Sequence, residues 1–190
     1  MIIKNISLII LVLVILFSCA APPPQERIVY LSSEYRDSLV DWSKIEGTSS
    51  VTGSAFLRQR NGAVQTCAAY EVMLVPFTDY ADERMRYIYN GYAGLNNNVT
   101  FLGNNVNNKF QPDHPSYQQG FIKSVCDQSG NFKFSNVASG DYFLVATVVW
   151  ESVSVDPIFN QVGTIFNGGA LMKKISVQEG TEHNHILTIN

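Results

Sequence analysis

Residues 127–150 read DQSGNFKFSNVASGDYFLVATVVW and decide the fold of this chain. The first four form a turn, because Asp and Gly both favour tight chain reversals. Residues 131–134 alternate Phe with polar residues, as a strand with one buried face does. A second turn at Gly140-Asp141 leads into residues 142–150, which are apolar on both faces. Such a run is typical of a strand at the centre of a sandwich, so the chain is predicted to be mainly all-β.

The segments on either side add further strands and turns. These strands are expected at residues 53–58, 71–75, 170–177 and 185–189. Asn61-Gly62 and Glu179-Gly180 supply turn signals between them. Pro76 ends the second strand, because proline cannot donate a ladder hydrogen bond. We therefore expect residues 47–190 to form a β-sandwich of about seven strands.

The pattern within residues 127–145 resembles the core signature of carboxypeptidase regulatory-like domains. The matching positions are Asp127, Gly130, Asn131, Phe132, Phe134, Val137, Gly140, Asp141, Tyr142, Leu144 and Val145. Gly53-x-Ala55 followed by Val72-x-Leu74-x-Pro76 is similar to that family's first hairpin. The resemblance covers residues 51–76 and 121–189. It implies a transthyretin-like Greek-key sandwich with a non-catalytic accessory role, and it carries over no binding residues.

The N-terminus resembles the signal of a bacterial lipoprotein. Lys4 precedes an apolar run over residues 6–17, which is short for a membrane-spanning helix. The run ends in Leu16-Phe17-Ser18-Cys19, which is similar to the lipobox of lipoproteins. Residues 1–18 are therefore predicted to be a cleaved signal peptide, and Cys19 is predicted to carry a lipid. The alternative is a buried helix with an incidental cysteine.

The residues that follow the lipobox predict the membrane to which the protein is sorted and the segment that tethers it. By analogy with lipoprotein sorting in double-membraned bacteria, Ala20 favours the outer membrane of a Gram-negative cell envelope. Residues 19–31 hold three consecutive prolines and are expected to form the lipid anchor and an extended Pro-rich leash. Residues 32–46 are expected to hold a short amphipathic helix from Ser33 to Ser43. Its expected cap is Ser32 or Ser33, and its apolar face is Tyr35, Leu39 and Trp42.

Composition and cysteine usage narrow the class of protein further. Without residues 1–18 the chain has about 170 residues, which suits one domain. Its net charge is then slightly negative, so nothing indicates nucleic-acid binding. Cys67 and Cys126 remain in a chain predicted to be exported, and a disulfide between them is the natural hypothesis. The bridge would close a loop of about 60 residues and contribute on the order of 4 kcal/mol. The alternative is two buried free thiols.

Residues 77–119 form an insertion in which we expect any surface function to lie. Thr78 can cap a helix from Asp79 to Tyr92, and an Asn-rich loop follows at residues 96–108. The candidate ligand face consists of Tyr87, Tyr92, Asn97 and Tyr117, which could bind a peptide or glycan by stacking and amide hydrogen bonds. The alternatives are core packing for the helix stripe and a mobile loop for the rest. The sequon at residues 98–100 is expected to be idle in a bacterial chain.

Catalytic chemistry is hard to assemble from this sequence. It has three histidines, no phosphate-binding glycine motif and no paired-cysteine metal spacing. His183 and His185 are two residues apart with Glu182 beside them, but the third and fourth ligands of a zinc site are missing. His114 is expected to be solvated in the loop. We therefore expect no catalytic residues, no metal and no cofactor.

The leading expectation for function is a lipid-anchored, non-enzymatic envelope protein that acts as an interaction or scaffolding module. Its partners would be the membrane, through the lipid on Cys19, and an envelope protein. The alternative is a carbohydrate- or peptide-binding surface lipoprotein. A small envelope hydrolase is the third hypothesis, and the absence of any recognisable triad or metal motif weighs against it.

Overall fold

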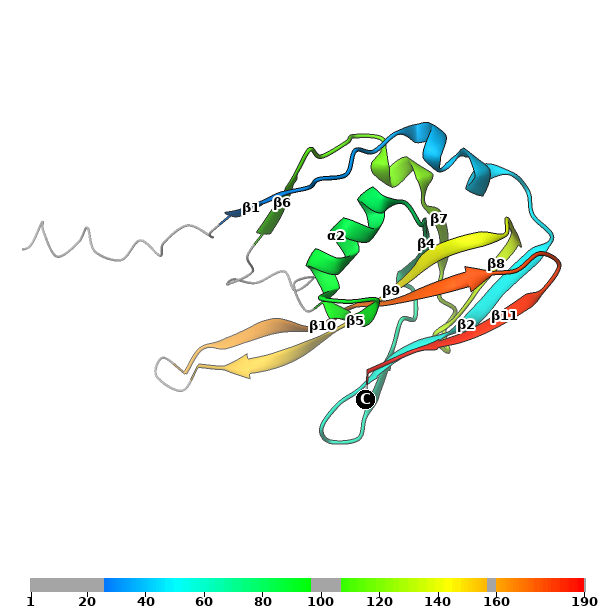
Figure 1. Ribbon diagram of the computed structural model, residues 1–190. Helices are drawn as coiled ribbons and strands as arrows, with labels where there is room; N and C mark the ends of the chain where they lie inside the picture. Colours follow the sequence, from blue (N-terminus) through cyan, green and yellow to red (C-terminus); the bar gives the residue numbers. More distant parts are fainter. Residues whose placement is uncertain (1–25, 97–106, 157–159, 190) are drawn as a thin grey trace, which may run out of the picture.

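Two β-sheets packed face to face form the body of the molecule (Figure 1). The computed structural model describes residues 26–96, 107–156 and 160–189. Cys19, Asn97 and the sequon at residues 98–100 lie outside these ranges. Within them the chain is mainly strand, with a single α-helix, so the predicted all-β sandwich is confirmed. None of the helices described is long and apolar enough to span a bilayer.

The larger sheet has the antiparallel order β5-β10-β9-β4-β7. Its strands are β4 (Glu71–Pro76), β5 (Ala93–Asn96), β7 (Ile122–Val125), β9 (Gly140–Val155) and β10 (Val162–Val177). The run predicted to be the central strand is part of β9, which lies in the middle of this sheet. β9 and β10 are both longer than predicted, because they continue together past residue 150.

The smaller sheet is organised around β2. Its strands are β2 (Ser49–Arg58), β3 (Val64–Thr66), β8 (Asn131–Val137) and β11 (Glu182–Leu187). One edge of β2 pairs in parallel with β11. The other edge pairs antiparallel with β8 along its first half and with β3 along its second half. Every strand predicted from residue 53 onward is therefore present, with shifted ends.

Strand β9 is apolar on both faces because it contributes to two cores. Tyr142, Leu144, Ala146 and Val148 pack into the core between the sheets. Phe143 and Val145 pack into a second core on the outer face of the larger sheet. That second core is covered by helix α2 (Asp79–Tyr89) and by a parallel pair of strands, β1 (Glu26–Tyr30) and β6 (Asn107–Gln111).

The predicted disulfide is present between Cys67 and Cys126. Their Cα atoms are 5.7 Å apart, and 59 positions separate them in the sequence. Cys67 follows β3 of the smaller sheet, and Cys126 follows β7 of the larger sheet. Both are buried in the core between the sheets, so the bridge ties one sheet to the other.

The segment before the sandwich differs from the prediction. Residues 26–30 are strand β1 rather than leash, because β6 offers them a parallel partner. The expected helix from Ser33 to Ser43 is replaced by two 3₁₀ helices, Asp37–Leu39 and Asp41–Lys44. The N-cap position of the first is Arg36, and the backbone N–H groups of Ser32 and Ser33, the expected caps, donate to the Glu83 carboxylate. The expected common face is absent as well, since Tyr35 is buried and Leu39 is exposed.

The described parts of the insertion, residues 77–96 and 107–119, contain more regular secondary structure than the sequence suggests. Helix α2 begins where expected, and the Thr78 side chain accepts a hydrogen bond from the Ala81 N–H. It ends at Tyr89 instead of Tyr92, because Asn90 adopts the left-handed conformation that terminates helices. Beyond the undescribed residues, the chain forms β6 and a 3₁₀ helix at Tyr117–Gly120.

Candidate ligand-binding site

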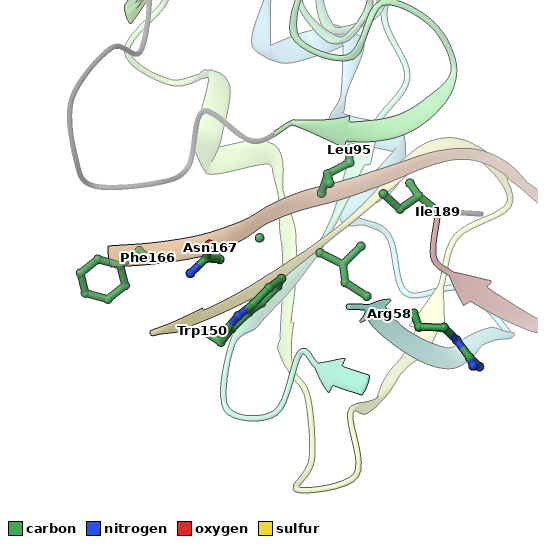
Figure 2. A pocket seen from close by; sticks show the side chains of 8 residues that line it. Arg58, Leu95, Trp150, Phe166, Asn167 and Ile189 are labelled. Carbon is green, nitrogen blue, oxygen red and sulfur yellow. The ribbon is translucent and has the colours of Figure 1, made fainter. Parts of the chain in front are cut away.

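Strands β9 and β10 extend beyond the rest of the larger sheet as a two-stranded arm, residues 148–155 and 162–169. Among the described residues, β4 pairs with β9 as far as Ala146, and β5 pairs with β10 from Ala170 onward. A pocket of about 350 Å³ lies at the base of this arm (Figure 2). It is lined by Leu57, Arg58, Leu95, Trp150, Phe166, Asn167, Gly168 and Ile189.

The indole of Trp150 forms one wall of the pocket and lies against Gly168, which leaves room for it. Gly168 has φ +96°, and a Cβ at this position would lie 2.8 Å from Cζ3 of Trp150 and 2.1 Å from the Val148 carbonyl oxygen. Glycine therefore allows the ring to lie against the backbone of β10, as aromatic side chains do over strand glycines. Trp150 also packs against the core between the sheets. Its ring is thus fixed before any ligand arrives.

The amide of Asn167 stands beside this ring. Asn167 and Trp150 are directly paired across β9 and β10, so their side chains share one face. The amide nitrogen donates to Ser152 Oγ at 2.8 Å, which orients the group. With the nitrogen so engaged, the amide oxygen is the atom that can receive a hydrogen bond from a ligand.

Apart from Phe166 of β10, the remaining lining residues come from three other segments. Leu57 from β2, Leu95 from β5 and Ile189 after β11 make the apolar side of the pocket, while the guanidinium of Arg58 lies at its rim and points away from Trp150 (Figure 2). The pocket therefore combines a flat aromatic face and apolar walls with a few polar groups. This is the usual composition of a site that binds small molecules or short oligomers.

The structure describes three residues of the predicted ligand face, and Asn97 lies outside the described residues. Tyr87 and Tyr92 are exposed, whereas Tyr117 is buried. Tyr117 packs edge-on against Tyr80 and lies 4.7 Å from the Arg84 guanidinium. Burial raises the pKa of Tyr117 well above its usual value. The expectation of an exposed Tyr117 is therefore corrected: the residues around it close into the second core.

Tyr87 borders another hollow, of about 490 Å³, which is also lined by Arg27, Glu83, Arg86 and Asn90. Its charged groups are largely engaged in the fold. Arg86 pairs with Asp82 at 3.0 Å. Burial alone would raise the pKa of Glu83, but hydrogen bonds from Ser32 and Ser33 outweigh it and hold this pKa below its usual value. This hollow is therefore a weaker candidate for a ligand site than the Trp150 pocket.

The histidines are drawn into local contacts. The rings of His183 and His185 lie parallel with centroids 6.3 Å apart, so they share a face as predicted. The Gln178 N–H donates to His183 Nε2 at 3.0 Å. Burial lowers the pKa of His185, and Lys173 and His183 lower it further. In the described part of the chain, no three His, Cys, Asp or Glu side chains come together as metal ligands would.

His114 differs from its expected place in a solvated loop. It is half-buried, and its ring centroid lies 5.0 Å from that of Tyr35. Its Nδ1 accepts a hydrogen bond from the Ser116 N–H. The residue therefore belongs to the packing of the insertion.

Sequence reasoning misses the Trp150 pocket because its members come from five separate segments. The apolar pattern places Trp150 in a buried strand, and nothing local reveals that its ring reaches an open end. One signal is present: Gly168-Gly169 lies beside an otherwise strand-like run. A glycine within a strand often marks a close approach of another group, which here is the indole.

Comparison with known proteins shows the fold. No family model matches the sequence, and no curated protein matches it. Among solved structures, a "putative carbohydrate binding protein" from Pseudomonas aeruginosa superposes with a TM-score of 0.62 at 18% identity, over 83% of this chain and 99% of that chain. A 9R-lipoxygenase from Cyanothece reaches a TM-score of only 0.28 at 13% identity, over 84% of this chain and 18% of that one.

Proposed function

We propose that this chain is a non-catalytic carbohydrate-binding protein of the bacterial cell envelope. It would be tethered to a membrane by a lipid on Cys19 and bind glycan in the Trp150 pocket. The observation that carries the proposal is the indole of Trp150, fixed against Gly168 with the Asn167 amide beside it. A fixed aromatic face stacks on the C–H face of a sugar ring, and an adjacent amide can accept a hydrogen bond from a hydroxyl group.

Two further points support this function. The pocket is open and lies beside an arm that no other strand covers in the part of the chain described. It can therefore admit one or two units of a longer polymer. The Pseudomonas aeruginosa protein with the same fold is itself described as a putative carbohydrate binding protein. That description concerns the other protein, and it makes glycan the first ligand class to test here.

The interaction module expected from the sequence is the second candidate. Exposed Tyr87 and Tyr92 favour it, because aromatic side chains are enriched in protein interfaces. They lie on and just after helix α2, away from the core between the sheets. Crosslinking in cells should then capture one envelope protein in a Tyr87-dependent way.

Two tryptophans allow the glycan proposal to be tested at a defined place. The chain contains only Trp42 and Trp150. The W42F variant leaves Trp150 as the sole reporter in the pocket. The W150F variant leaves Trp42, whose ring packs 5.1 Å from that of Tyr142, near the start of β9. Full-length protein in nanodiscs would be titrated with chitotetraose and with neutral and acidic hexose oligomers.

We expect saturable changes in emission for W42F and none for W150F. Trp150→Ala should weaken binding, measured by calorimetry, by about tenfold or more, because it removes the stacking face. Equal responses from the two single-tryptophan variants would place the ligand elsewhere. No response to any oligosaccharide would refute the proposal.

A further inference from the structure

The outer end of the β9–β10 arm exposes a row of branched apolar side chains. Val153, Val155 and Val162 are exposed to 73%, 55% and 73%. Val155 pairs directly with Val162, and Val153 lies two residues before Val155 in β9, so all three share one face. Branched apolar side chains are normally turned toward a core. An exposed patch of them indicates a surface that contacts another molecule or a membrane.

Nothing in the described chain covers this valine face. The arm begins where the pairing of β4 and β5 with its two strands ends. Figure 1 shows it projecting from the body at one end of the molecule. Exposed sheet edges are usually protected by charge or by covering elements, and here charge is sparse. Glu151 is the ionisable residue that shares the valine face within the described part of the arm.

The arm extends toward the end of the molecule at which β1 begins. In Figure 1 the start of β1 lies at the same end of the molecule as the end of the arm. Glu26 is preceded by the apolar run of residues 6–17 and by Cys19. The seven peptide links from Cys19 to Glu26 can span at most about 25 Å. A membrane attachment through this segment therefore holds the valine end of the molecule close to the bilayer.

We propose that the valine face of the arm rests in the lipid surface to which the chain is tethered. The arm and the tether would then form two contacts with one membrane and fix the orientation of the domain above it. The side chains would enter the boundary between headgroups and acyl chains, as the apolar faces of interfacial segments do. This contact rests on the proposed tether and does not depend on glycan binding.

Glu151, which lies on the valine face, predicts which lipids the arm can contact. Basic patches bind membranes through anionic lipids and release them at high salt. The valine face has no cation among its described residues and carries Glu151. Binding should therefore persist on neutral phosphatidylcholine and be insensitive to salt.

The test uses full-length lipoprotein reconstituted into phosphatidylcholine vesicles. Val155→Cys would be labelled with the fluorophore NBD, since Cys67 and Cys126 are joined and Cys19 is expected to be lipidated. The matched control is Ile45→Cys, whose native side chain is 68% exposed. Ile45 lines a hollow with Trp42, the ring that packs on Gly140 at the start of β9. Gly140 is fifteen residues from Val155, which corresponds to about 50 Å along the strand.

We expect the label at position 155 to emit at shorter wavelength and to be quenched several-fold more by doxyl-labelled lipid than the label at position 45. Adding Val153→Ser and Val162→Ser should remove this difference. Vesicle flotation is measured in parallel. Floating protein with equal, water-like emission from both labels would overturn the arm contact and leave the tether intact.

Two other outcomes would also overturn the proposal. A blue shift at position 155 without lipid quenching, together with energy transfer between labelled copies, would show that a second copy covers the arm. Protein that does not float with vesicles would overturn the arm contact and the tether together. The tryptophan titration reports on glycan binding separately in each case.

Discussion

Gly168 controls the pocket through a single missing atom. Its φ is +96°, and a Cβ at this position would lie 2.8 Å from the indole, so both the backbone and the ring disfavour any side chain there. We expect Gly168→Ala to destabilise the fold by about 1–3 kcal/mol, through backbone strain and displacement of Trp150. Urea denaturation followed by tryptophan emission would measure this change.

Gly163→Ala is the matched control for that substitution. Gly163 lies in the same strand, and a Cβ there meets no atom within 4 Å. Its effect should be within about 0.5 kcal/mol of zero. Similar losses for the two variants would show that β10 tolerates no added side chain and that the indole contact has no special weight.

Glu83 supplies a pH-dependent attachment for the N-terminal segment. Its pKa lies below the usual 4.5 in the folded protein, because the effect of burial is outweighed by hydrogen bonds from Ser32 and Ser33. A lowered pKa gives stability that is present above pH 4.5 and is lost as the pH falls through the folded value. Glu83→Gln should therefore speed amide exchange in β1 at neutral pH and make little difference in acid. Glu46→Gln, at an exposed site, should leave amide exchange in β1 unchanged both at neutral pH and in acid. An effect of Glu83→Gln that does not depend on pH would contradict the role given to the Glu83 carboxylate.

Residue identities alone could predict some contacts and not others. The disulfide followed from two cysteines in a chain predicted to be exported, and the structure contains it. Tyr117 looked like a loop residue, because its neighbours are Gln and Pro. Its burial depends on Tyr35, Tyr80 and Arg84, which lie far away in sequence and come together only through the fold.

At the scale of elements, the cap of helix α2 gives a clean test. The Thr78 hydroxyl accepts from the Ala81 N–H at 3.1 Å, and Thr78 is buried. Thr78→Ala should cost about 1 kcal/mol of stability, because one N–H at the helix start loses its partner. Thr78→Ser keeps the hydroxyl and should retain most of that energy. Equal losses in thermal or urea denaturation would assign the effect to the lost methyl group instead.

Elements with a strong local pattern were predictable, and those that depend on distant partners were not. A long apolar run predicted β9, and a capping residue followed by an acidic first turn predicted α2. β1 and β6 were missed, because they pair in parallel across about 80 positions of sequence and each has only five residues. The first half of β10 was missed too, since Asn167-Gly168-Gly169 interrupts its strand-like pattern.

At the scale of the whole molecule, the bridge between the sheets should dominate stability. Cys67 and Cys126 are 59 positions apart, so the crosslink removes much freedom from the unfolded chain. Replacing both with Ala should lower the free energy of unfolding by on the order of 4 kcal/mol. The two cores remain, so the variant should still fold at low temperature with native circular dichroism. Reduction of the wild type should have a comparable effect, and a loss below about 1 kcal/mol would show that sheet packing alone sets the stability.

The sandwich was predictable as a whole because its inner core follows from alternating and continuous apolar patterns. The second core was not, because it combines β1, α2, β6 and the outer face of the larger sheet. Its position explains why β9 and β4 are apolar on both sides. The outer end of the arm lies past the strands that pair with β9 and β10 in the described chain, and its valines are exposed.

The parallel pairing of β1 with β6 has a mechanical consequence. A load pulling on residue 26, away from the body, would draw β1 lengthwise past β6, whose far end continues into Pro112, where Tyr80 is hydrogen-bonded. The backbone hydrogen bonds of the pair would then be strained together in shear, not broken in turn as when a hairpin is peeled. Just after β1, the hydrogen bonds of Ser32 and Ser33 to Glu83 would resist the same pull. Single-molecule pulling at residue 26 should therefore meet a higher rupture force in the wild type than in Glu83→Gln, which weakens the bonds from Ser32 and Ser33.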